Sequence, residues 1–103
     1  MIKKFSLFVG LNDKDTKKQR ISTIEAYKII ENVLIEKVGG GSIFERRGIH
    51  KHESGEVVIE STLNIELYGI EENQAIEIIS ILKIALNQES IILQTENVNS
   101  KFV

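Results

Sequence analysis

The sequence predicts an α+β protein with the ferredoxin-like split βαβ order (βαββαβ), a four-stranded antiparallel sheet with two helices on one face. Residues 57–68 alternate between apolar and polar side chains, which is typical of a strand with one buried face. Residues 22–38 and 71–87 instead repeat apolar side chains every three or four positions, as helices that pack on such a face do. Because the crossovers between parallel strands are right-handed, we expect the first and third strands in the middle of the sheet.

A β-hairpin over residues 48–68 is the strongest local signal. Glu53-Ser54-Gly55 forms a three-residue turn, because glycine takes the left-handed conformation that this turn type needs. The turn pairs Ile49 with Ile59, whereas a register shifted by one residue would bury both histidines of the hairpin at a large desolvation cost. We therefore expect one face of the return strand to be buried through five apolar side chains: Val57, Ile59, Leu63, Ile65 and Leu67.

The other elements follow from shorter patterns. Residues 4–10 alternate as a strand, and a polar stretch from 11 to 20 predicts a long loop. Ser22-Thr23-Ile24-Glu25 matches the capping box that begins a helix, and Gly39-Gly40-Gly41 ends it. We expect the second strand over residues 42–51, the second helix from about Glu71 to Asn87 and the last strand from Glu89 to Glu96.

Length and composition exclude several classes of protein. The chain of 103 residues suits a single domain over residues 1–103, and its 42% hydrophobic content predicts a folded core. It has no cysteine, so disulfides and thiolate chemistry are excluded. No apolar run approaches the roughly 18–20 residues of a membrane helix, and the N-terminus has no secretory signal pattern. We expect a soluble, cytoplasmic protein.

The two halves of the chain differ in charge. Residues 1–52 carry 11 Lys and Arg against 6 Asp and Glu, a balance of +5, whereas residues 53–103 carry 2 against 9, a balance of −7. The net charge of −2 disfavours nucleic acid as a partner. The asymmetry either disperses when the chain folds, or it steers an anionic ligand or drives head-to-tail self-association.

Two short patterns carry a resemblance to other proteins. The opening Leu7-Phe8-Val9-Gly10-Leu11 and the closing 87–93 stretch (NQESIIL), followed by Ser100-Lys101-Phe102, resemble a bacterial family of unknown function. The loop over residues 10–16 is similar to small uncharacterised bacteriophage proteins. Neither resemblance implies an activity or site residues, but the second suggests a phage protein that antagonises host defence.

Candidate ligand-binding residues lie on the sheet face that the helices leave open and in the polar loop. The hairpin register places Arg46 opposite Thr62, with Asn64 beside them, and a guanidinium with hydroxyl and amide neighbours can bind a phosphate or carboxylate. The alternative is a cross-strand pair of Arg46 with Glu60 that only stabilises the hairpin. The full set of candidates is Lys14, Lys17, Arg46, His50, Thr62 and Asn64. The loop that carries the two lysines is either functional or a solvated connection.

We find no catalytic or cofactor motif in the sequence. His50 and His52 share a strand face, but with Glu53 they make a poor metal site, so we expect no metal and no cofactor. We expect a non-enzymatic binding protein that sequesters a small anionic or nucleotide ligand or masks a host defence protein. The alternative is a small dimeric α+β barrel-type enzyme with His50 as its acid–base group, which requires His50 to be at least half buried in a polar cavity.

A homo-oligomer is expected because apolar side chains remain outside the predicted core. The open face carries Phe8, Phe44 and Val58, and the second helix adds Ile76, Ile81 and Ile84. Monomers rarely expose contiguous apolar patches of more than a few hundred Å².

Overall fold

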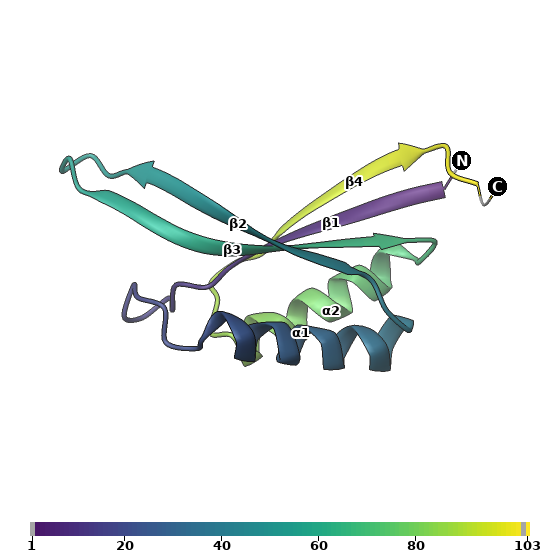
Figure 1. Ribbon diagram of the computed structural model, residues 1–103, viewed down its shortest axis with the longest axis horizontal. Helices are drawn as coiled ribbons and strands as arrows, with labels where there is room; N and C mark the ends of the chain where they lie inside the picture. The colour runs from purple at the N-terminus through teal and green to yellow at the C-terminus, as the bar shows by residue number, and fades with distance from the viewer. Residues whose placement is uncertain (1, 102) are drawn as a thin grey trace.

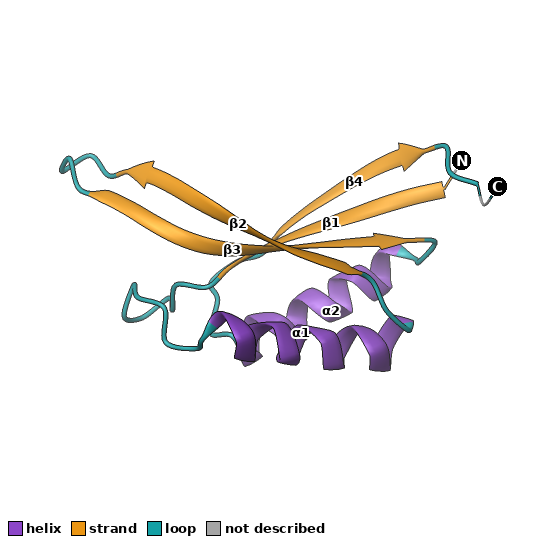
Figure 2. Ribbon diagram, in the orientation of Figure 1, coloured by secondary structure: helices purple, strands orange, loops and turns teal. Residues whose placement is uncertain are grey.

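The structure, a computed structural model, describes residues 2–101 and 103, so Phe102 of the C-terminal pattern lies outside the described residues. Its elements are β1 (Ile2–Gly10), α1 (Thr23–Val38), β2 (Ser42–Lys51), β3 (Val57–Tyr68), α2 (Glu72–Ala85) and β4 (Ile92–Val98). The strands form one antiparallel sheet in the order β2-β3-β1-β4. Both helices cover the same face of the sheet (Figures 1 and 2). The predicted α+β, ferredoxin-like architecture is confirmed, with β1 and β3 in the middle.

Local capping contacts fix the ends of the helices, and most of them were predicted from the sequence. The Ser22 side chain accepts a hydrogen bond from the backbone N–H of Glu25 at 3.1 Å, and Gly39 ends α1 in the left-handed conformation with φ 83°. At α2 the capping box forms between Glu71 and Gln74, whose side chain accepts from the Glu71 N–H at 2.8 Å. The second helix is therefore slightly shorter than expected, because Glu71 caps it instead of belonging to it.

The core lies between the sheet and the two helices. Every second residue of β1 from Phe5 to Val9 is fully buried, and so is the matching face of β3 from Leu63 onward. The helices contribute six buried side chains, Ala26, Ile30 and Leu34 from α1 and Ala75, Ile78 and Leu82 from α2. The predicted helical stripes are thus confirmed, and the opposite face of the sheet has no helix over it.

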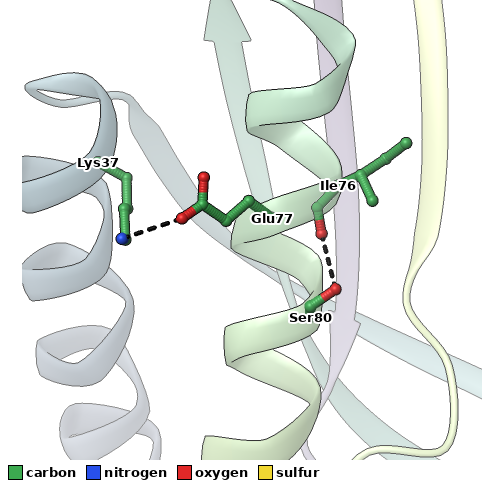
Figure 3. Close-up of polar contacts among 4 residues, drawn as sticks. All are labelled: Lys37, Ile76, Glu77 and Ser80. Carbon is green, nitrogen blue, oxygen red and sulfur yellow. Dashed lines mark hydrogen bonds and ion pairs between the residues drawn. The ribbon is translucent and has the colours of Figure 1, made fainter.

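The two helices also meet through polar side chains at the surface. Lys37 of α1 lies 3.0 Å from Glu77 of α2, and the Ser80 hydroxyl donates to the Ile76 carbonyl at 3.1 Å within α2 (Figure 3). Such exposed pairs contribute little to stability, so the buried apolar side chains hold the helices together. Ile76 and Ile84 are 49% and 85% exposed, as the pattern of α2 predicted.

The hairpin between β2 and β3 has the predicted register but is less buried than expected. Ile49 pairs with Ile59, the Gly55 φ is 92°, and the His52 N–H donates to the Glu56 carbonyl at 2.8 Å. The expectation that Val57 and Ile59 are buried was wrong, since they are 58% and 50% exposed. The reason is that the hairpin extends past the helices (Figure 1), so neither helix covers this end of the strand pair. We call residues 48–60 the hairpin arm.

Candidate functional site

A groove of about 600 Å³ lies on the open face of the sheet. Five segments of the chain form it: β1, the loop after β1, the β2–β3 hairpin, the turn after α2 and the start of β4. Its lining residues are Phe8, Gly10, Asn12, Asp13, Lys14, Lys17, His50, His52, Glu56, Val58, Glu60, Thr62, Gln88, Glu89, Ser90 and Ile92. This volume is in the range of pockets that hold small molecules, which are about 300–1,000 Å³.

Glu60 is a carboxylate that a backbone N–H of the loop after β1 holds in place. It lies on the central strand β3, partly buried, and its Oε2 accepts a hydrogen bond from the Asn12 backbone N–H at 2.8 Å. Gly10 makes this position possible, because a Cβ atom at residue 10 would come within 2.7 Å of Glu60 Oε2. The sequence therefore places a glycine where a carboxylate must lie against the end of β1.

The loop between β1 and α1 is an ordered part of the site. Asp13 accepts hydrogen bonds from the Asp15 and Thr16 backbone N–H groups, both at 3.0 Å, and from the Asn87 side-chain amide at 2.7 Å. The Asn87 amide, followed by the Thr16 N–H, lowers the pKa of Asp13 to about 2. The Gln88 amide donates to the Asn12 carbonyl at 2.9 Å, so the turn after α2 holds the loop against the groove. The loop is thus ordered at Asn12 and Asp13, while residues 14–20 are exposed, and its functional role stays a proposal.

Four of the six predicted site residues line the groove: Lys14, Lys17, His50 and Thr62. Lys17 has a φ of 62°, a left-handed conformation that costs energy for a residue with a side chain. His50 is exposed, and its ring centroid lies 5.3 Å from that of His52. The half-buried His50 that the enzyme alternative required is therefore absent, although the residue does face a polar groove.

Arg46 and Asn64 lie beside the groove and do not line it. The Arg46 guanidinium is 6.0 Å from the centroid of the Phe8 ring, and the register places Arg46 opposite Thr62 as predicted. Within the described residues Arg46 forms no ion pair with Glu60, because the Asn12 N–H holds the Glu60 carboxylate toward β1. Asn64 is 3% exposed.

A second groove of about 720 Å³ lies along the hairpin arm. Its charged lining residues are Lys17, Lys18, Glu45, Arg47 and the predicted site residue Arg46, and the exposed apolar side chains of Val57 and Ile59 also line it. It is the larger of the two, but it contains no carboxylate or amide that the backbone holds in place as it holds Glu60. We therefore take the open-face groove as the candidate site.

The charges along the groove favour a ligand with positive charge. Its lining includes four carboxylates, Asp13, Glu56, Glu60 and Glu89, against the two ammonium groups of Lys14 and Lys17. The expectation of an anionic ligand therefore finds no support in the groove, since its basic residues are outnumbered. The basic N-terminal half of the chain suggested an anion, but folding interleaves it with acidic residues of β3 and of the turn after α2.

Sequence reasoning missed Glu60, Gly10 and Asn12 as site residues. A signal for Glu60 was present, because a charged residue in the middle of a central strand is costly unless something pairs with it. Nothing in the sequence linked it to Gly10 and Asn12, which lie about 50 positions earlier in the chain and meet it only through the pairing of β1 with β3.

The described residues contain neither a metal-binding cluster nor a helix that could span a membrane. Residues 2–101 and 103 contain no group of three or more His, Cys, Asp or Glu side chains that could hold a metal ion. No helix among them is long and apolar enough to cross a membrane.

Two solved structures of phage proteins have the same fold. A phage SAM lyase in complex with S-methyl-5'-thioadenosine superimposes with a TM-score of 0.66 at 19% identity, over 92% of this chain and 80% of the other. The same kind of enzyme in its apo state gives a TM-score of 0.66 at 20% identity, over 91% and 78%. No protein-family model matches the sequence, and no curated protein matches it. The resemblance to a bacterial family thus has no support, while the likeness to phage proteins extends to the fold.

These structures correct the functional expectation from the sequence. We expected a non-enzymatic binding protein because no catalytic motif was present, and that interpretation was wrong: the fold neighbours are lyases. The enzyme alternative fits the comparisons better. The physical reason is that catalysis does not require one of the common catalytic motifs, because position and charge in a groove can also accelerate a reaction.

Proposed function

We propose that this protein is a small enzyme that cleaves a sulfonium nucleoside of the S-adenosylmethionine class in the open-face groove. The observation that carries the proposal is the Glu60 carboxylate, held by the Asn12 N–H in an acidic groove of about 600 Å³. The likeness of the fold to the phage SAM lyase supports it. The substrate has two positive groups, a sulfonium and an ammonium, and one carboxylate.

The charged side chains of the groove match these parts of the substrate. Glu60 binds a positive group, and Lys14 and Lys17 bind the substrate carboxylate from the loop. In the reaction an oxygen of the substrate's own carboxylate forms a bond to the Cγ carbon of the methionyl chain while the bond from that carbon to sulfur breaks. The electron pair of the broken bond stays on sulfur, so the products are the neutral thioether S-methyl-5'-thioadenosine and a lactone of the amino-acid chain, and the enzyme needs no oxidant, reductant, water or proton donor.

Product analysis tests this proposal. Purified protein is incubated with S-adenosylmethionine, and S-methyl-5'-thioadenosine is measured by chromatography with mass detection. We expect product with the wild type and a loss of about 100-fold or more with Glu60→Gln, because orientation and charge supply most of the catalysis. Glu72→Gln on the exposed start of α2 is the matched control. A wild type that leaves the substrate intact under all conditions refutes the proposed activity.

His50→Ala tests the acid–base role that the sequence suggested. His50 lines the groove but is exposed, so we expect the rate of product formation to fall by less than about 10-fold. Removal of a general acid–base group would instead lower this rate by about 100-fold or more. A loss of that larger size, with a pH–rate profile that loses one limb, would assign the chemistry to His50 instead of Glu60.

We also propose that the protein forms a homo-oligomer and that it acts against host defence. A homo-oligomer is supported by Ile49, Val57 and Ile59, which are at least half exposed on the helix side of the hairpin arm. Light scattering at tens of micromolar tests it, and a monomeric mass refutes it.

A role against host defence would follow from phage origin and from the removal of a host metabolite. A host strain that expresses the protein should then show a depleted pool of S-adenosylmethionine.

A further inference from the structure

Three side chains form a row across the open face of the sheet. The register pairs Phe8 of β1 with Asn64 of β3, and Asn64 with Phe44 of β2. An amide therefore lies between two aromatic side chains on neighbouring strands. Phe8 also lines the groove, as does Thr62, two positions from Asn64 on the same face of β3.

The Asn64 side chain has an unmet polar group. The residue is 3% exposed, and its Oδ1 atom has no hydrogen-bond partner among residues 2–101 and 103. Buried polar atoms in folded proteins are nearly always paired, so an unpaired one requires an explanation. A purely structural asparagine would have a partner within the sheet. An acceptor without one suits a donor that arrives with a ligand.

The spacing of the row suits a flat ring. Neighbouring strands are about 4.8 Å apart, so the strands that carry Phe8 and Phe44 are separated by roughly 10 Å. A planar ring in contact with an aromatic side chain on each side needs about 7–8 Å between them. Such a ring would stand with its edge toward Asn64. Phe44 is 42% exposed, which leaves its side chain free to move aside and admit the ring.

We propose that Asn64 recognises the edge of an adenine base held between Phe8 and Phe44. The amide offers an acceptor beside a donor, and adenine presents the complementary pair on one edge, its amino group beside N7. Hypoxanthine presents two acceptors on that edge, its carbonyl and N7, so neither orientation of the amide can pair with both. The inference rests on the proposed function, because it assigns the base-binding end of the same substrate.

The position of Asn64 relative to Glu60 agrees with one bound nucleoside. The two residues lie on the same face of β3, four positions apart, or about 13 Å along the strand. An adenine at the aromatic row would direct its ribose and its 5' sulfur over Thr62 toward Glu60. Base recognition then takes place beside the groove, at Asn64, and charge recognition inside it, at Glu60.

Calorimetry with two nucleosides tests the inference. The probes are S-methyl-5'-thioadenosine and S-methyl-5'-thioinosine, which differ only in the base edge. We expect the wild type to prefer the adenine form by about 10- to 100-fold, and Asn64→Leu to lose that preference and a similar factor in affinity. Asn97→Leu, a matched change on β4 away from the open face, should leave both affinities unchanged. The melting temperature of Asn64→Leu should equal or exceed that of the wild type, because the buried oxygen has no partner to lose.

Each other outcome overturns a defined part of the argument. If the wild type binds both nucleosides equally, the role of Asn64 is overturned and the proposed activity is not affected. This holds even if Asn64→Leu fails to fold. An Asn64→Leu protein that has lost stability or changed its mass in light scattering also overturns it, because the amide would then serve the fold or a second copy. Binding that depends on Asn64 without cleavage of S-adenosylmethionine leaves this inference standing and refutes the proposed activity. A wild type that binds neither nucleoside refutes both.

Discussion

Replacement of Gly10 by alanine should change stability in a way that depends on Glu60. A Cβ atom at residue 10 would come within 2.7 Å of Glu60 Oε2 and 2.9 Å of its Cδ. These atoms are the flexible end of the side chain, so the Glu60 carboxylate will swing away and give up the Asn12 N–H. A hydrogen bond to a charged group contributes about 1.5–3 kcal/mol, and the partly exposed position of Glu60 favours the lower end.

Two effects of the substitution oppose each other. Alanine in a strand is favoured over glycine by about 0.5–1 kcal/mol, because it loses less backbone entropy on folding. Gly10→Ala should therefore destabilise the wild type by about 0.5–1 kcal/mol. This is the energy of the lost hydrogen bond, about 1.5 kcal/mol, minus the gain of about 0.5–1 kcal/mol from backbone entropy. In a Glu60→Ala background there is no carboxylate to displace, so the same substitution should stabilise the protein by about 0.5–1 kcal/mol.

The assay is urea unfolding followed by circular dichroism, on the wild type, the two single variants and the double variant. The coupling energy of the cycle should be about 1.5 kcal/mol, well above the usual error of additivity for independent sites of about 0.3–0.5 kcal/mol. Product formation from S-adenosylmethionine should fall with Gly10→Ala as it does with Glu60→Gln, because both displace or neutralise the same carboxylate. If Gly10→Ala changes the free energy of unfolding by the same amount and in the same direction in both backgrounds, Gly10 does not position Glu60 and this reasoning is refuted.

Three further predictions concern the fold and the loop. Because the pKa of Asp13 is lowered to about 2, its ionised form stabilises the folded state above the ordinary value of 3.8, and this stabilisation is lost as the pH falls through about 2. Urea unfolding between pH 5 and pH 2 should show this loss in the wild type and not in Asp13→Asn; identical pH profiles would contradict it. Ile78→Ala should destabilise the fully buried core by about 2–5 kcal/mol, whereas Ile84→Ala, at an 85% exposed position, should change the free energy of unfolding by less than about 0.5 kcal/mol. Ser22→Ala should cost about 1 kcal/mol through the lost cap of α1, measured in the same way, and no measurable cost would show that water replaces the hydroxyl.

The sequence by itself determined the elements and their arrangement. The period of two in residues 57–68 and the periods near 3.6 in both helices depend only on which side chains must leave water. The turn at Glu53-Ser54-Gly55 set the hairpin register, because glycine supplies the left-handed conformation locally. These features were predictable since each one is decided within about ten neighbouring residues.

The extent of burial could not be predicted from the same patterns. Val57 and Ile59 alternate like core residues, yet they are exposed because the helices end before they reach the hairpin arm. Alternation reports which face of a strand a residue occupies. It does not report whether another element covers that face, since that depends on the length and placement of helices elsewhere in the chain.

The contacts that hold the site together were decided by tertiary structure, although four of the residues that line it were predicted from the sequence. Glu60 meets Asn12, and Asn87 meets Asp13, across 48 and 74 positions of sequence, so no local pattern could join them. Antiparallel pairing of β1 with β3 brings the first pair together, and the docking of the turn after α2 on the loop brings the second. The charge of the groove has the same origin, because acidic side chains from the second half of the chain fold over the basic loop of the first. A sequence rich in lysine near its start thus forms a groove whose carboxylates outnumber its ammonium groups.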